Sequence, residues 1–121
     1  MKGITLKTKE EIARMREAGR RLAFVLRTVG ESATPGVSTK ELNDLCDRLI
    51  REIPGDTPAF YHYQPAGAFR PFPASCCISV NEVVVHGIPN EEPYILKDGD
   101  IVSIDAGLTR EKLIVDSTIT V

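Results

Sequence analysis

Two aspartates near the C-terminal end of the sequence have the residue type and spacing best suited to chemistry. Asp105 lies in the apolar segment 101–108 and Asp116 in the segment 113–121, with a short polar stretch between them. We expect these segments to pair as a hairpin centred between residues 110 and 111, which places the two aspartates opposite each other with about 4.5–5.5 Å between their Cβ atoms. Carboxylates this close repel each other unless a cation lies between them. The pair predicts a site for divalent metal ions with oxygen ligands, and two incidental aspartates in a structural hairpin are the alternative.

His86 and a pair of adjacent cysteines are the other candidates for contact with a ligand. His86 ends the apolar segment 83–86, which is expected to form a strand, and the glycine that follows leaves room for its side chain to project into a cleft. A single histidine is nevertheless more often structural than catalytic. Cys76 and Cys77 lie in a predicted strand, so their side chains point to opposite faces and at most one can face a pocket. The absence of a Cys-x-x-Cys spacing argues against a zinc–thiolate site.

Two helices and several strands are expected to position these residues. Capping boxes predict where the helices begin, because Thr8 is followed by Glu11 and Ser38 by Glu41. The expected elements are helices over 9–29 and 39–53, a long loop over 55–74, and strands over 75–80, 83–86, 101–108 and 113–121. The loop holds aromatic side chains that could line a pocket or only pin the loop to the core: Tyr61, His62, Tyr63, Phe69 and Phe72. Helices followed by antiparallel strands predict an α+β fold.

Size, composition and charge favour one ordinary globular domain. The sequence has 121 residues, 42% of them hydrophobic, and a net charge of −2. This balance gives no reason to expect direct binding to nucleic acids or membranes. The three cysteines make a poor disulfide framework because their number is odd and two are adjacent, which favours a reducing compartment and a cytoplasmic location. Cys46 falls on the apolar stripe of the second helix and is expected in the core.

Five stretches of the sequence together resemble the type I methionine aminopeptidases, which are pita-bread metallopeptidases. These stretches are KTKEEIARMREAGR at 7–20, PGVST at 35–39, NEVVVHGIP at 81–89, DGDIVSIDAGL at 98–108 and VDSTITV at 115–121. They follow the family's order, and the resemblance covers essentially the whole chain. The combination is specific, because the histidine–glycine pair precedes one aspartate, and a second aspartate follows eleven residues later.

The resemblance implies a fold, an activity and a role for four residues. The family folds as two pseudo-symmetric α+β halves and removes the initiator methionine from nascent proteins, using one or two divalent ions such as cobalt, manganese, iron or zinc. Asp105 and Asp116 match metal ligands, the second of which bridges both ions. His86 matches the histidine that contacts the substrate and helps to stabilise the transition state. Cys77 matches a residue near the methionine pocket. The implied partners are peptides with an N-terminal methionine or nascent chains, with the ribosome as a further possible partner.

The sequence departs from the family's pattern in its length. Complete members supply five metal ligands, and this chain matches only the two aspartates. We therefore expect residues 1–121 to be a single domain, the N-terminal half of the fold with the C-terminal half absent, which binds metal weakly and has no significant peptidase activity. A non-catalytic pita-bread-like binding module and a purely structural α+β domain are the alternatives. The segment 113–121 would leave an exposed apolar edge, which predicts a homodimer or poor solubility.

Overall fold

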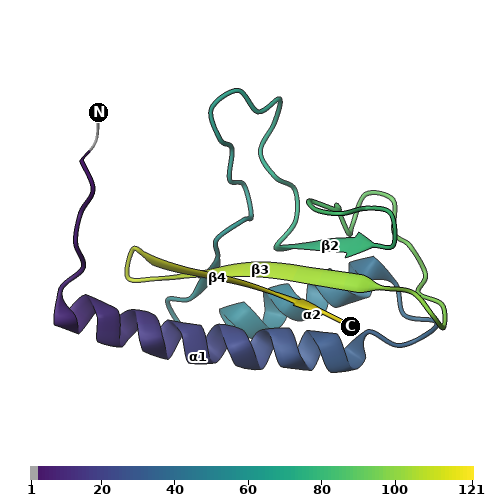
Figure 1. The fold of residues 1–121 in the computed structure, drawn as a ribbon, viewed down its shortest axis with the longest axis horizontal. Coiled ribbons are helices and arrows are strands. Elements are labelled where there is room, and N and C mark those ends of the chain that lie inside the picture. The colour runs from purple at the N-terminus through teal and green to yellow at the C-terminus, as the bar shows by residue number, and fades with distance from the viewer. Residues whose placement is uncertain (1–2) are drawn as a thin grey trace.

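Two helices and a four-stranded antiparallel sheet form the protein. The computed structural model describes residues 3–121, so residues 1 and 2 of the expected domain lie outside the described residues. The elements are α1 (Lys9–Ser32), α2 (Thr39–Arg51), β1 (Thr57–Pro58), β2 (Cys76–Val80), β3 (Val102–Arg110) and β4 (Leu113–Thr120). Both helices lie on one side of the sheet (Figure 1). The predicted α+β fold is confirmed. None of the described helices is both long and apolar enough to cross a membrane.

Both helices begin at the predicted capping boxes. The Glu11 N–H donates to Thr8 Oγ1 at 3.1 Å and the Thr8 N–H donates to Glu11 Oε2 at 2.7 Å, which satisfies two amide groups that the first turn of a helix leaves free. Ser38 and Glu41 exchange the same pair of bonds at the start of α2. Because these caps depend only on nearby residues, the sequence alone is enough to predict where the helices begin. The helix ends differ from it by two or three residues.

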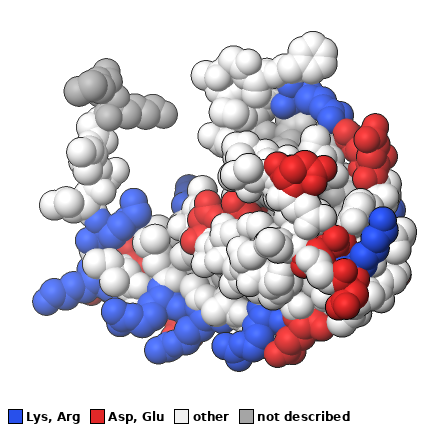
Figure 2. All heavy atoms as spheres, turned by 45° about the vertical axis from the view of Figure 1, so that its right-hand side comes forward, with Lys and Arg blue, Asp and Glu red and all other residues white. Residues whose placement is uncertain are grey.

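The helices bury one apolar face each and leave a charged face in solvent. The fully or nearly fully buried residues of the two helices include Ala18, Leu22, Val25, Leu26, Val29, Leu42, Cys46, Leu49 and Ile50. Cys46 is 0% exposed, which confirms its predicted place in the core. Lys and Arg side chains gather along the lower side of the molecule over α1, with acidic side chains among them (Figure 2). This mixture is typical of a solvated helix face.

β3 is the central strand, and it corrects the predicted register of the closing hairpin. β4 pairs with one edge of β3, while β1 and β2 pair with the other. The hairpin turns at Glu111 and Lys112, whose φ angles of 48° and 67° are both left-handed, as a two-residue turn between twisted strands requires. The hairpin is therefore centred one residue later than predicted, and Asp116 lies opposite Gly107 instead of Asp105. A shift of two in the pairing keeps both aspartates on one face, as diagonal neighbours.

Residues 59–73 form a projecting loop, called the arm below, that rises from the sheet on the side away from the helices (Figure 1). At its base, the Ala59 N–H donates to the Gly107 carbonyl at 2.9 Å. The two limbs of the arm pair through two bonds, from the His62 N–H to the Phe72 carbonyl at 2.9 Å and from the Phe72 N–H to the Tyr63 carbonyl at 2.8 Å. The arm thus has a hydrogen-bonded structure of its own and reaches beyond the body of the molecule.

A buried ion pair fixes the chain just before the arm. Arg110, at the end of β3, donates two hydrogen bonds to the Asp56 carboxylate, both at 2.7 Å. Asp56 is 3% exposed, so its charge is compensated by the arginine rather than by water. The hydrogen bonds that Arg110 donates to Asp56 raise the pKa of its guanidinium. The base of the arm is therefore anchored to the same strand that carries Asp105.

Candidate metal and substrate site

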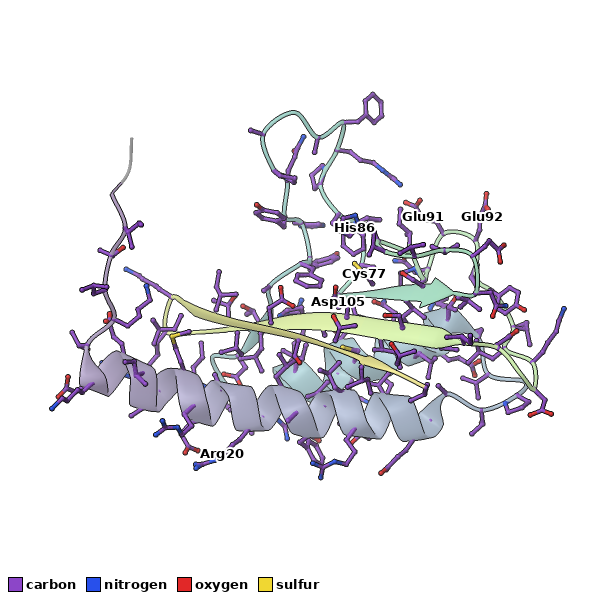
Figure 3. All side chains as sticks on the ribbon, viewed as in Figure 1. Arg20, Cys77, His86, Glu91, Glu92 and Asp105 are labelled. Carbon is purple, nitrogen blue, oxygen red and sulfur yellow. The ribbon has the colours of Figure 1, made fainter. Side chains whose placement is uncertain are left out.

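A cavity on the sheet face away from the helices brings together all four residues singled out in the sequence. Cys77 on β2 lies directly opposite Asp105 on β3, and Asp116 on β4 is a diagonal neighbour of Asp105. Figure 3 shows Asp105, Cys77 and His86 on this side of the sheet. The cavity has a volume of about 510 Å³, and Cys77, His86, Asp105 and Asp116 all line it. One wall is therefore polar and acidic, although its members lie far apart in the sequence.

The two aspartates leave negative charge without a compensating partner. Asp105 Oδ1 is buried and accepts no hydrogen bond from any described residue. Asp116 is open to solvent on one side, but burial on the other and the negative charge of Asp105 raise the pKa of its carboxyl. An unpaired buried carboxylate oxygen is costly, and a cation between two carboxylates would remove both the repulsion and the unmet acceptor. The pair therefore fits a divalent ion, as two ligands of a larger set.

The described residues do not supply a complete set of ligands. Within residues 3–121, no three His, Cys, Asp or Glu side chains are grouped closely enough to hold a metal ion together. His86 lines the same cavity but belongs to its rim rather than to a compact triad with the aspartates. Transition metals in proteins usually have at least three protein ligands. The site shown here is open on one side.

The neighbouring thiol is an uncharged part of the cavity wall. Burial, followed by the charges of Asp105 and Asp116, raises the pKa of Cys77 to about 12, so the thiol stays protonated near neutral pH. A protonated thiol is a poor nucleophile and a weak metal ligand. Cys76 points the opposite way, into the core beside Cys46, and its pKa is also raised, chiefly by a hydrogen bond with Cys46. The prediction that only one of the adjacent cysteines faces a pocket is confirmed.

His86 reaches the cavity from a loop, and the predicted strand over 83–86 is wrong. This apolar segment forms no strand, and its valines are 43%, 80% and 61% exposed in chain order. Only Gly87 pairs with the free edge of β2: its carbonyl accepts from the Ile78 N–H at 3.0 Å, and its N–H donates to Ser79 Oγ at 3.0 Å. His86 itself has a left-handed φ of 58°. The sharp turn there stops further pairing and directs the imidazole to the rim.

Gly87 is the residue that allows this close approach. A Cβ atom added to it would overlap the Ile78 carbonyl oxygen and would lie 2.8 Å from the Ile78 carbonyl carbon. These are backbone atoms of a paired strand and cannot move aside easily. The histidine–glycine pair is thus one structural unit: the glycine brings the loop against β2, and the histidine is placed at the cavity as a result.

The arm supplies the apolar wall opposite the carboxylates. Its residues that line the cavity are Phe60, Tyr63, Pro65, Ala68, Phe69, Arg70, Pro71, Phe72 and Pro73. Of the aromatic residues suggested from the sequence, Tyr63, Phe69 and Phe72 line the cavity. Tyr61 and His62 do not, and their rings stack on each other with centroids 3.9 Å apart.

Phe60 and Arg70 also line the cavity, and neither is predicted from the sequence. A signal for the first was available at Gly107, where an added Cβ would lie 2.8 Å from Phe60 Cε1. A glycine inside a predicted strand often marks such a close approach. Arg70 gave no comparable signal, because its partner lies 21 residues further along the chain.

Comparison with known proteins assigns the chain to a family. The methionine aminopeptidase of Aquifex aeolicus (strain VF5) is 42% identical over 118 residues, which are 98% of this chain and 45% of that protein. The solved methionine aminopeptidase of Rickettsia prowazekii superposes with a TM-score of 0.84 at 36% identity, over 98% of this chain and 44% of that one. The solved methionine aminopeptidase of Thermotoga maritima superposes with a TM-score of 0.85 at 35% identity, over 98% of this chain and 45% of that one. The chain thus matches slightly less than half the length of these relatives, and its fold is one half of theirs. The model of metallopeptidase family M24 matches residues 13–121, a range that contains Cys77, His86 and both aspartates, and the chain belongs to this family.

Proposed function

We propose that this chain is the N-terminal half of a methionyl aminopeptidase and supplies two metal-binding carboxylates and the methionine pocket. The observation that carries the proposal is the buried, unpaired Oδ1 of Asp105, which lies beside Asp116 in a cavity with an apolar opposite wall. A negative, under-coordinated face suits a cation, and an aromatic face suits a long apolar side chain. A substrate with both an N-terminal amino group and a methionine side chain meets both requirements.

Asp105 and Asp116 would hold the metal, and two divalent ions from the group of cobalt, manganese, iron and zinc are the proposed cofactors. Such ions supply Lewis acidity toward a peptide carbonyl and toward water. The role of the two aspartates is to hold negative charge at a fixed position on the rigid β3–β4 hairpin. Fixed carboxylates need no reorganisation when a cation binds, which favours binding.

The other cavity residues would bind and orient the substrate. The rings of Tyr63 and Phe72 give an unbranched thioether the aromatic contacts that sulfur prefers. The protonated Cys77 adds a small apolar surface at the floor of the cavity. His86, at the rim, is positioned to donate a hydrogen bond to the substrate carbonyl, where negative charge develops during peptide hydrolysis.

The site needs further ligands, and we propose that they come from a C-terminal half that is not part of these 121 residues. The chain covers only 44–45% of the solved relatives. The resemblance implies three more ligands, one histidine and two glutamates, and a second half is where they would lie. On this proposal, residues 1–121 alone bind metal weakly and turn over no substrate.

Titration with Mn²⁺ or Co²⁺ tests the metal assignment. The wild-type chain should bind either ion weakly, and Asp116→Asn should lower the affinity by more than about tenfold because one of two anionic ligands is lost. Asp44→Asn is the matched control, since Asp44 is an exposed helix residue that pairs with Lys40 at 2.6 Å and does not line the cavity. If Asp116→Asn binds like the wild type, or if the wild type shows no affinity, the aspartates are structural. Hydrolysis of the dipeptide Met-Ala by these residues alone would contradict the expected inactivity.

The proposed location is the cytoplasm, and the proposed substrates are nascent chains, which such an enzyme would meet at the ribosome. All three cysteines are free thiols within the fold. Buried free cysteines, two of them adjacent, suit a reducing compartment. The cavity is open to solvent on the side away from the helices, which is compatible with an extended peptide as substrate.

We also propose that isolated residues 1–121 dimerise through the outer edge of β4. Among the described residues β4 pairs only with β3, and Ile114 on it is 57% exposed. An unpaired strand edge of this kind is a template for a second strand. Sedimentation velocity should show a concentration-dependent dimer that is weakened in Ile114→Lys, because a charged residue on an edge strand opposes pairing. A wild-type chain that stays monomeric at high concentration would rule the dimer out.

A further inference from the structure

Among residues 3–121, one ion pair links the outer part of the arm to the rest of the molecule. Its base is held by the Ala59–Gly107 hydrogen bond and its end by a bond from Asn90 Nδ2 to the Pro73 carbonyl at 3.0 Å. The tip turns through residues 64–69 by hydrogen bonds within the arm. Phe69 at the tip is 99% exposed, so apolar packing does not hold the tip in place.

That attachment is a two-pronged ion pair between Arg70 and Glu91. Arg70 Nη1 and Nη2 donate to the two carboxylate oxygens of Glu91, each at 2.6 Å. Two parallel hydrogen bonds fix the orientation of the guanidinium relative to the carboxylate as well as the distance between them. Glu91 belongs to the loop that follows His86, and the two lie on the same side of the sheet in Figure 3. The bond therefore joins the aromatic wall of the cavity to the loop that carries the histidine.

The pair joins two neighbouring hollows of the surface. Arg70 lines the main cavity, whereas Glu91 lines a neighbouring hollow that shares His86 and Ile88 with it. Pro71 follows Arg70 and disfavours a helical backbone conformation at the arginine. The arm is stiffened by prolines and by its paired limbs, so movement at the tip carries the whole aromatic wall.

An exposed ion pair is a reversible attachment. The Arg70 and Glu91 side chains are 49% and 41% exposed, and pairs in contact with water contribute little to the stability of a whole fold. A small contribution is nevertheless enough to bias the position of a loop whose tip is exposed to solvent, as Phe69 is. It also leaves the loop able to open when a ligand enters or leaves.

We propose that Arg70 and Glu91 form a latch that holds the arm closed over the cavity, and that Arg70 is a positioning residue for the first side chain of the substrate. This inference rests on the proposed function, because the closed arm places its aromatic rings around that side chain. Opening the latch should weaken binding of the side chain and increase arm mobility. The chemistry at the aspartates should be unaffected.

Arm mobility can be measured without any ligand, as the rate of chymotrypsin cleavage after Tyr63 under native conditions. This bond lies in the arm and is identical in all the variants. Glu91→Arg and Arg70→Glu should each increase the rate by about fivefold, because proteolysis follows the population of opened molecules. The double variant Arg70→Glu/Glu91→Arg should restore the slow rate, since the charges are exchanged and the pair can form again. Raised salt should speed cleavage of the wild type and of the double variant, which both have the ion pair, but not of the single variants.

Substrate positioning is measured as the affinity of the same variants for Met-Ala, followed by NMR titration with Gly-Ala as the comparison peptide. Each single variant should weaken Met-Ala binding by a similar factor, and the double variant should recover it. Arg14→Glu is the matched control: Arg14 pairs with Glu111 at 2.9 Å, also between distant segments and exposed, but away from the arm.

The two readouts separate the latch from the proposed function. Faster cleavage in the single variants, with recovery in the double variant and matching changes in affinity, supports the latch and its positioning role. Unchanged cleavage in Glu91→Arg overturns the latch, whatever the peptide does. Faster cleavage with unchanged Met-Ala affinity overturns the positioning role. If no variant, including the wild type, binds Met-Ala, the proposed function fails, while the cleavage rates still decide whether the latch exists.

Discussion

Replacing Gly87 by alanine should destabilise the protein by about 3–5 kcal/mol and displace His86 from the cavity. The new methyl group would overlap the Ile78 carbonyl oxygen and would lie 3.0 Å from Ser79 Cα. Forcing atoms into a filled space costs about 1–3 kcal/mol. The loop would also lose its bonds to Ile78 and Ser79, which contribute about 1 kcal/mol each. Urea unfolding measures the first effect, and the NMR signals of the His86 ring report the second.

Gly19→Ala is the matched control, with the opposite expected sign. Gly19 lies inside α1, and an added Cβ would meet no atom within 4 Å. Alanine in a helix interior is about 1 kcal/mol more favourable than glycine. The same chemical change should therefore stabilise the protein at one glycine and destabilise it at the other. If Gly87→Ala unfolds at the wild-type urea concentration, the loop does not approach β2 as closely as described.

The parts of the fold that were predictable from sequence are those set by nearby residues. Both helix starts follow from capping boxes in which the partners are three residues apart. Strands β2, β3 and β4 follow from apolar segments bounded by turn residues. The prediction that Asp105 and Asp116 lie on the same face of the sheet is correct although the predicted register is wrong. The register differs by two residues, and side chains in a strand alternate between faces with a period of two.

The parts that could not be predicted depend on contacts between distant segments. The hairpin turns at Glu111 and Lys112, which adopt left-handed conformations that the sequence usually signals with asparagine or glycine. The segment 83–86 has strand-forming residues but forms no strand. The hydrogen bond to the free edge of β2 is made instead by Gly87, the residue after His86. The role of Arg70 in the cavity depends on how the arm folds back, which no local pattern encodes.

Replacing Asp105 by asparagine should have opposite effects on metal affinity and on the stability of the metal-free chain. Asparagine has nearly the same shape but no charge, so it removes the unpaired buried oxygen charge and the repulsion from Asp116. We expect the free energy of unfolding without metal to rise by about 1 kcal/mol. Affinity for Mn²⁺ should fall below detection, because an amide oxygen is a weaker ligand than a carboxylate. Thermal unfolding with and without Mn²⁺ measures both effects on the same samples.

The same substitution at Asp100 provides the contrast. The Asp100 carboxylate accepts hydrogen bonds from Asn81 Nδ2 at 2.9 Å and from the Lys97 N–H at 2.8 Å, and the bond from Asn81 is the main reason that its pKa is lowered. Asp100→Asn should therefore lower the unfolding midpoint, whereas Asp105→Asn raises it. A decrease at both positions would mean that the Asp105 carboxylate stabilises the metal-free fold and is not held there for a cation.

Saturating Mn²⁺ should then reverse the order of stability between the wild type and Asp105→Asn. A ligand that binds only the folded state stabilises it by an amount that grows with the ratio of its concentration to its dissociation constant. The wild type gains this stabilisation and the variant does not, so their unfolding midpoints should cross as Mn²⁺ is added. The concentration at the crossing gives the affinity of two carboxylates acting without further ligands. A metal-binding role for Asp105 predicts that its carboxylate destabilises the metal-free fold and stabilises the fold when a cation is bound. An incidental aspartate would not show this change of sign.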